Sequence, residues 1–288
     1  MTALFALATS LLWGLADFGG GLLSRRTPAL TVVVVSQCVA AAVLGVVVAA
    51  TGAWSEAGPR LWFAVAAGAV GPVAMLSFYK ALALGPMGVV SPLGSLGVAV
   101  PVGVGLLVGE RPGLLQFAGV AVAVAGVVLA GGPQLRGAPV QRQAVALTLL
   151  AAFGFGAVMS LISEASTTVP GLFLALFVQR VTNIAVGGTA LGVSVRRGGR
   201  ALPQEGGLAA VRSALPALAF VGLADVAANG TYSIAAQHGP VTVAAVLASL
   251  YPVVTALAAR GVLGERLRGI QTAGAGLALL GTVLLATG

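Results

Sequence analysis

One eleven-residue stretch occurs twice in this chain, and the repeat decides the fold. Residues 109–119 read GERPGLLQFAG, and residues 264–274 read GERLRGIQTAG. The Gly-Glu-Arg triplet, a glutamine and a final glycine recur at the same places in both copies, at a constant offset of 155 residues. Each copy separates two hydrophobic runs near the end of one half of the chain. The sequence therefore consists of two related halves.

Features upstream of these turns repeat in the same order. The matching pairs are Trp13-Gly14 with Phe153-Gly154, Tyr79 with Tyr232, Gly85-Pro86 with Gly239-Pro240, and Ser95-Leu96 with Ser249-Leu250. We predict a first repeat over residues 1–131, a linker over 132–142 and a second repeat over 143–288.

The composition excludes a soluble protein. Of the 288 residues, 58% are hydrophobic and only 8% are charged, with a mean hydropathy of +1.05, whereas soluble domains carry about 25% charged residues. The net charge of +8 comes mostly from arginines in short loops, which favours the lipid bilayer and not nucleic acid as the partner. One cysteine, Cys38, and one histidine, His238, leave no predicted disulfide, metal site or cofactor site.

Ten hydrophobic runs are long enough to cross a membrane of ordinary thickness. They lie at about 3–23, 29–51, 61–84, 87–108, 113–131, 143–163, 170–193, 214–236, 240–262 and 268–287. Five spans per repeat is an odd number, so the second repeat enters the bilayer from the opposite side. We therefore predict an all-α integral membrane protein with ten transmembrane helices, arranged as two inverted five-helix repeats around a central cavity.

These motifs resemble the EamA-domain branch of the drug/metabolite transporter superfamily over the whole chain. The resemblance is carried by Leu12-Trp13-Gly14, by the segment from Tyr79 to Pro86, and by the two Gly-Glu-Arg turns. It implies ten helices around a cavity and export or exchange of small metabolites without ATP. Arg180 matches an arginine that the family often carries early in the second span of a unit, where the first repeat has Gln37.

Two predicted spans carry charges near the middle of the membrane, where an ionisable side chain costs about 2.5–3.5 kcal/mol. Each charge has polar neighbours on its own helical face. These two groups are Gln179, Arg180 and Asn183 on one span, and Asp225, Asn229 and Tyr232 on the next. Two interpretations stay open: a polar wall of the substrate cavity, or a structural ion pair between Arg180 and Asp225.

A second candidate group includes Trp13 and Asp17 on the first span and Tyr79 and Lys80 on the third. Asp17 and Lys80 could pair as a gate or a titratable site. Alternatively, both are boundary charges that reach the membrane surface. Trp13 and Tyr79 are candidates for stacking on a substrate.

Other residues have predicted roles in motion or in turns. Pro92 and Pro101 interrupt the fourth span and Pro252 interrupts the ninth, so we expect hinges there. Glu110 and Glu265, each beside an arginine in a turn, are expected to cap the helix that follows or to hold the loop.

The sequence thus predicts a secondary transporter and not an enzyme, because no nucleophile–base set, phosphate-binding loop or metal motif is present. An arginine with an aspartate suits an amino acid or related zwitterion, moved by alternating access, with export favoured over uptake. The alternatives are a proton-coupled exporter of organic cations that uses Asp17, and, in another class, a membrane scaffold or intramembrane enzyme. We expect a multi-pass protein of the plasma (inner) membrane, as a monomer or homodimer, with a proton as a possible coupling ion.

Basic residues predict the orientation of the chain. Twelve lie at odd-numbered loops, and only Arg60 and Arg111 lie at even-numbered ones; the twelve are Arg25, Arg26, Lys80, Arg136, Arg142, Arg196, Arg197, Arg200, Arg212, Arg260, Arg266 and Arg268. The positive-inside rule puts the odd-numbered loops in the cytoplasm and both termini outside. The family resemblance implies termini inside; we favour the charge bias because it is large.

We predict that a phosphatase fused to the C-terminus is active, since that enzyme works only outside the cytoplasm. A reporter that works only in the cytoplasm should be inactive at the same position. The reverse pair of results would contradict this orientation.

Overall fold

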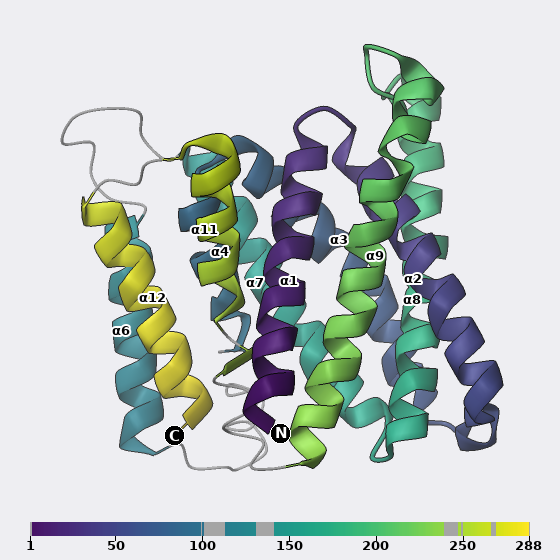
Figure 1. Cartoon of the computed structure of the whole chain (residues 1–288), viewed down its shortest axis with the longest axis horizontal. Helices are drawn as coiled ribbons and strands as arrows, with labels where there is room; N and C mark the ends of the chain where they lie inside the picture. The colour runs from purple at the N-terminus through teal and green to yellow at the C-terminus, as the bar shows by residue number, and fades with distance from the viewer. Residues whose placement is uncertain are drawn as a thin grey trace.

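The computed structural model consists of helices joined by short connections (Figure 1). It describes residues 2–98, 100, 113–130, 141–238, 247–248, 250–265 and 269–287. In chain order the elements are α1 (Thr2–Ser24), α2 (Ala29–Thr51), the 3-10 helix η1 (Ala53–Glu56), α3 (Leu61–Leu84), α4 (Met87–Gly94), the 3-10 helix η2 (Ser95–Val98), α6 (Leu114–Ala130), α7 (Arg142–Ala165), α8 (Val169–Arg196), α9 (Gly207–Gln237), α11 (Tyr251–Leu263) and α12 (Gly269–Thr287).

Several of these helices have the length and composition of membrane spans. Within the described residues, six are long and apolar enough to cross a bilayer: α1, α2, α3, α7, α8 and α9. Shorter apolar helices cover Met87–Gly97, Tyr251–Leu263 and Thr272–Leu284. The chain is therefore an all-helical, multi-pass membrane protein, and six of the predicted spans appear as helices of full length.

The basic residues gather at one end of the bundle. Arg25 of the α1–α2 loop bonds Glu265 after α11, and Thr31 near the start of α2 donates to the Ala201 carbonyl in the α8–α9 loop. α1 begins and α12 ends at the opposite end (Figure 1). We call this the basic end; its described members are Arg25, Arg26, Lys80, Arg142, Arg196, Arg197, Arg200, Arg212 and Arg260.

Glycines allow the helices to approach closely, as expected where apolar lipid weakens the hydrophobic drive for helix association. A Cβ at Gly14 of α1 would lie 2.7 Å from the Tyr251 carbonyl oxygen, and the Thr255 hydroxyl donates to the Gly14 carbonyl at 3.0 Å. Gly222 of α9 abuts the Ser36 carbonyl of α2 in the same manner. Any larger side chain at these two positions would push the paired helices apart.

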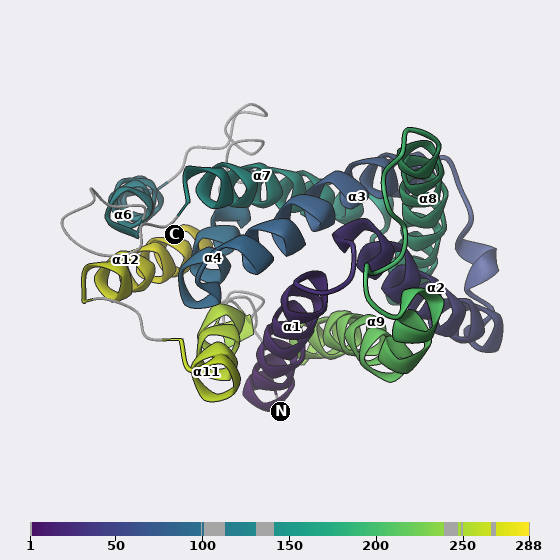
Figure 2. The same cartoon turned by 90° about the horizontal axis from the view of Figure 1, so that it is seen from above.

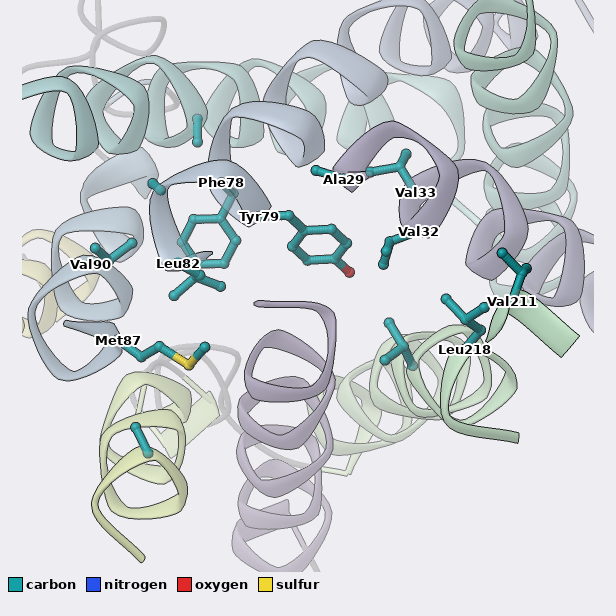
Figure 3. Close-up of a cluster of buried hydrophobic side chains, with 14 residues drawn as sticks. Ala29, Val32, Val33, Phe78, Tyr79, Leu82, Met87, Val90, Val211 and Leu218 are labelled. Carbon is teal, nitrogen blue, oxygen red and sulfur yellow. The ribbon is translucent and has the colours of Figure 1, made fainter. Parts of the chain in front are cut away.

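The buried apolar core joins α1, α2, α3, α4 and α9 near the basic end. Phe78, Leu82 and Met87 are buried, and the Phe78 ring meets Phe155 of α7 edge to face at 5.5 Å. Figure 3 shows the Tyr79 ring lying between α1 and the valines of α2, with its hydroxyl directed away from Phe78. This core fixes α3 against its neighbours and so positions Tyr79.

The observed helices differ from the predicted spans at the prolines. The predicted span 87–108 begins as α4, which contains Pro92 and gives way to the 3-10 helix η2 after Gly94. Pro252 lies in the first turn of α11, a position that tolerates proline; the hinge at this residue stays a prediction. Pro101 and Glu110 lie outside the described residues.

Two helices are longer than their predicted spans. α8 runs to Arg196 and α9 spans Gly207–Gln237, and Figure 1 shows both projecting beyond the other helices at the basic end. The hydropathy pattern missed these ends because they carry arginines that lie beyond the apolar core of the membrane.

Candidate functional site

A buried ion pair lies at the centre of the bundle. Arg180 Nη2 of α8 is 2.6 Å from Asp225 Oδ2 of α9, and Arg180 Nη1 donates to Gln37 Oε1 of α2 at 2.9 Å. The Arg180 and Asp225 side chains are only 8% and 23% exposed. Three helices therefore share one cation and its two partners. The ion pair that the sequence allowed is present.

The two members of the pair are not equally enclosed. Arg180 and Gln37 are buried, while Asp225 is half-buried. One turn after Asp225, the Asn229 side-chain amide donates to the Asp225 main-chain carbonyl at 2.7 Å. Asp225 is thus the more exposed member of the pair.

A second carboxylate, Asp17 of α1, lies close to this pair. Asp17 and Asp225 repel each other electrostatically, and Tyr79 of α3 interacts with both carboxylates and with Arg180. A Cβ at Gly20 would lie 2.7 Å from the Tyr79 hydroxyl oxygen, so this ring packs directly on α1. Within the described residues Asp17 has no ion pair or side-chain hydrogen bond. The group thus contains two carboxylates and one arginine.

Aromatic rings lie beside Asp17. Trp13 precedes Asp17 by one helical turn and therefore shares its face of α1. The Trp13 ring is 6.0 Å from Tyr232 of α9 and 6.2 Å from Tyr251 of α11, nearly perpendicular to the latter. Tyr251 also interacts electrostatically with Asp17. Three rings and a carboxylate thus meet where α1, α9 and α11 converge.

Not every predicted residue belongs to this group. Gln179 and Asn183 are buried against α3: a Cβ at Gly71 would lie 2.6 Å from Asn183 Nδ2 and 3.5 Å from Gln179 Nε2. Gln179 and Asn183 therefore lie in the contact between α8 and α3 and not beside Asp225. Lys80 is exposed near the end of α3 and forms no ion pair with Asp17 in the described part of the chain, so that predicted pair is absent.

Glu265 links three segments at the basic end. Its Oε1 accepts from Arg25 Nη2 at 3.0 Å, and its Oε2 accepts from the Met87 main-chain N–H at 2.8 Å. The carboxylate therefore caps the start of α4 while it holds the α1–α2 loop. The sequence predicted that Glu265 caps the helix that follows it or holds its own loop; the structure instead shows it at the start of α4 and on the α1–α2 loop, both in the first half of the chain.

Sequence reasoning missed Tyr251. It follows the repeated Ser249-Leu250 motif and stands next to Pro252, but aromatic residues are frequent near the ends of membrane helices. The Tyr251 ring lies near Asp17 because α11 packs closely on α1 at Gly14. That contact cannot be seen in the sequence. The repeat offers a weak signal, because the equivalent segment after Ser95-Leu96 has no aromatic residue.

The sequence profile of the EamA-like transporter family matches residues 1–132 and 142–287. The chain belongs to the EamA-like transporter family. Its members are transporters, so this multi-pass protein is a membrane transporter of small solutes.

Other comparisons add the fold alone. A solved structure, titled only as the crystal structure of a protein, matches with a TM-score of 0.59 at 17% identity, covering 99% of this chain and 96% of the other. No curated protein matches the sequence.

The ion pair gives a prediction with two separable readouts. Asp225→Asn should lower both stability and transport, because it leaves Arg180 charged and buried without its partner; such losses are about 3–5 kcal/mol in soluble proteins. Arg180→Gln combined with Asp225→Asn should restore thermal stability in detergent while transport stays lost. Restored transport in the double variant would contradict a role in binding.

Proposed function

We propose that this protein is a secondary transporter that moves a small solute by alternating access, with the solute bound beside Asp17 and Asp225. The observation that carries this proposal is the buried Arg180–Asp225 pair, which adjoins Asp17, a carboxylate that has no ion-pair partner among the described residues. Charges at such depth are costly unless they are partnered or line a polar cavity. Because this chain belongs to a transporter family, we infer that the cluster of Asp17, Arg180 and Asp225 binds the solute.

The helix contacts support two inverted five-helix repeats, residues 1–131 and 143–288, joined by 132–142. Under exchange of the halves α1 corresponds to α7, and α3 to α9. The extensive packing of α1 on α9 then has its counterpart in that of α7 on α3. α2 packs on α8, and α6 packs on α12. Exchange of the halves turns each of these two pairs into itself. These pairings are what a pseudo-two-fold axis in the membrane plane requires.

The contact of α1 with α3 and α4 has no counterpart among the described residues of the other repeat, and this asymmetry indicates which end of the transporter is closed. Near the basic end α1 packs on α3 and α4, with Gly21 against Leu82 and Met87. The equivalent helices α7 and α9 make no comparable contact among the described residues; Figure 2 shows them on opposite sides of the bundle. We infer a transporter closed at the basic end, where Glu265 joins Arg25 to α4, and ready to open there in the alternate state.

An amino acid or related zwitterion is our first candidate solute. Its ammonium group would bind Asp17, and its carboxylate would compete with Asp225 for Arg180, so that each charge keeps a partner. Export through the inner membrane is the favoured direction.

A second candidate is an organic cation exchanged for protons. Asp17 favours it, because Arg180 is already held by Asp225 and Gln37, whereas the described part of the chain offers Asp17 no such partner. Aromatic faces also attract cations, by about 0.5–2 kcal/mol. Trp13 shares the helical face of Asp17, Tyr251 interacts with Asp17, and Tyr232 packs on Trp13.

Uptake by proteoliposomes tests transport and separates these candidates. We expect labelled amino acids to accumulate, and Asp17→Asn to reduce their uptake at least tenfold. Glu164→Gln is the matched control, because Glu164 is exposed at the end of α7. Uptake of a quaternary ammonium compound that needs a pH gradient and Asp17 would support the second candidate. No uptake of either solute class would contradict both.

Closure of the basic end gives a further prediction. In a Cys38→Ser background, Leu82→Cys provides a reporter, because Leu82 is buried beneath the α1–α4 contact. Glu265→Gln should raise its labelling from the basic end several-fold, because the links to Arg25 and Met87 weaken. Glu205→Gln removes an exposed carboxylate at the same end and should leave labelling unchanged. Equal labelling in both variants would contradict a latch at Glu265.

A further inference from the structure

A groove of about 850 Å³ lies outside the central site, along the last three turns of α8. It is lined by Ala185, Val186, Thr189, Ala190, Val193, Ser194, Arg197 and Gly199. At 3.6 residues per turn, Val193 lies about 140° around the helix from Arg180. The groove therefore faces away from the Arg180 partners and opens on another side of α8.

The lining changes from apolar to cationic along the groove. Between Ala185 and Val193 only small and aliphatic side chains and one threonine contribute, and Val186 and Val193 are 37% and 41% exposed. At the basic end Arg197 closes the groove, and Arg196 and Arg200 are exposed beside it. The described residues show no ion pair for these arginines; Glu205 is the one acid of the connecting loop.

The length of the groove fits one leaflet of a bilayer. From Ala185 to Arg197 the helix rises about 18 Å at 1.5 Å per residue. Half of a bilayer, headgroups included, is about 20–22 Å thick. An acyl chain lying along α8 from the middle of the bilayer would thus bring its phosphate to Arg197.

We propose that this groove binds one anionic phospholipid, with an acyl chain along Ala185–Val193 and the phosphate against Arg197 and its neighbours. The charge of the arginines selects an anionic headgroup, since each basic residue near the surface contributes about 1 kcal/mol, or about fivefold in affinity. The apolar lining requires the chain as well as the headgroup. This site is independent of the proposed transport activity.

Native mass spectrometry of the purified full-length chain tests the proposal, with phosphatidylglycerol and phosphatidylcholine as probes. We expect one phosphatidylglycerol to be retained in preference to phosphatidylcholine. Arg197→Gln should weaken that binding about fivefold, whereas Arg60→Gln, which removes an exposed arginine at the opposite end, should have no effect. Equal losses in the two variants, or equal retention of both lipids, would overturn the proposal.

A second pair of variants tests the apolar part of the site. Val193→Trp fills the groove and should abolish the preference for phosphatidylglycerol. Val181→Trp is the matched control, because Val181 is 46% exposed on the same helix but does not line the groove. Soluble glycerol phosphate should compete poorly, since it lacks the chain. Competition at concentrations equal to those of the lipid, or retained preference in Val193→Trp, would identify a simple anion site and overturn the lipid proposal.

Discussion

The ion pair between Arg180 and Asp225 is the interaction on which the arrangement of the central helices depends. A guanidinium buried in a membrane protein needs partners at fixed positions, because water is not there to replace them. Its partners come from α2 and α9, so the register of three helices is set at one point. Gly222 then lets α9 lie against the α2 backbone at Ser36. The ion pair thus fixes the position of these helices along their axes, and small residues such as Gly222 allow the helices to approach closely enough to form it.

This pair also explains how a buried arginine is tolerated in the proposed solute site. The guanidinium of Arg180 is paired with Asp225 and Gln37 without any solute, so the protein does not bury an unpaired cation. Asp17 is different, because nothing in the described chain neutralises it, and its repulsion by Asp225 adds to its cost. Binding a cationic group or a proton removes both penalties.

Much of the fold could be predicted from sequence, and the reasons are physical. Hydropathy runs located the six full-length helices, because a bilayer demands about 20 apolar residues per span. The cost of a charge within a span singled out Arg180 and Asp225. Whether Gln179 faces the cavity or α3 depends on how α8 is rotated, and the spacing of residues does not fix that rotation. The contacts of Tyr251 and of Glu265 with the first half of the chain depend on which helices become neighbours. Such partners lie far apart in sequence and carry no local signal.

The two repeats share a scaffold but not its chemistry. Exchange of the halves relates Arg180 to Gln37, and these two side chains meet each other, so they lie near the proposed pseudo-two-fold axis. At the spacings of the matched motifs, Asp225 corresponds to Pro72 and Asp17 to Ala157. Both carboxylates and the rings of Trp13, Tyr232 and Tyr251 therefore lie on one side of that axis. In the proposed alternating-access cycle, a rocking motion would interchange the conformations of the repeats and leave these residues on their own helices, so the proposed solute site would stay beside α1 and α9 while the opening changes ends.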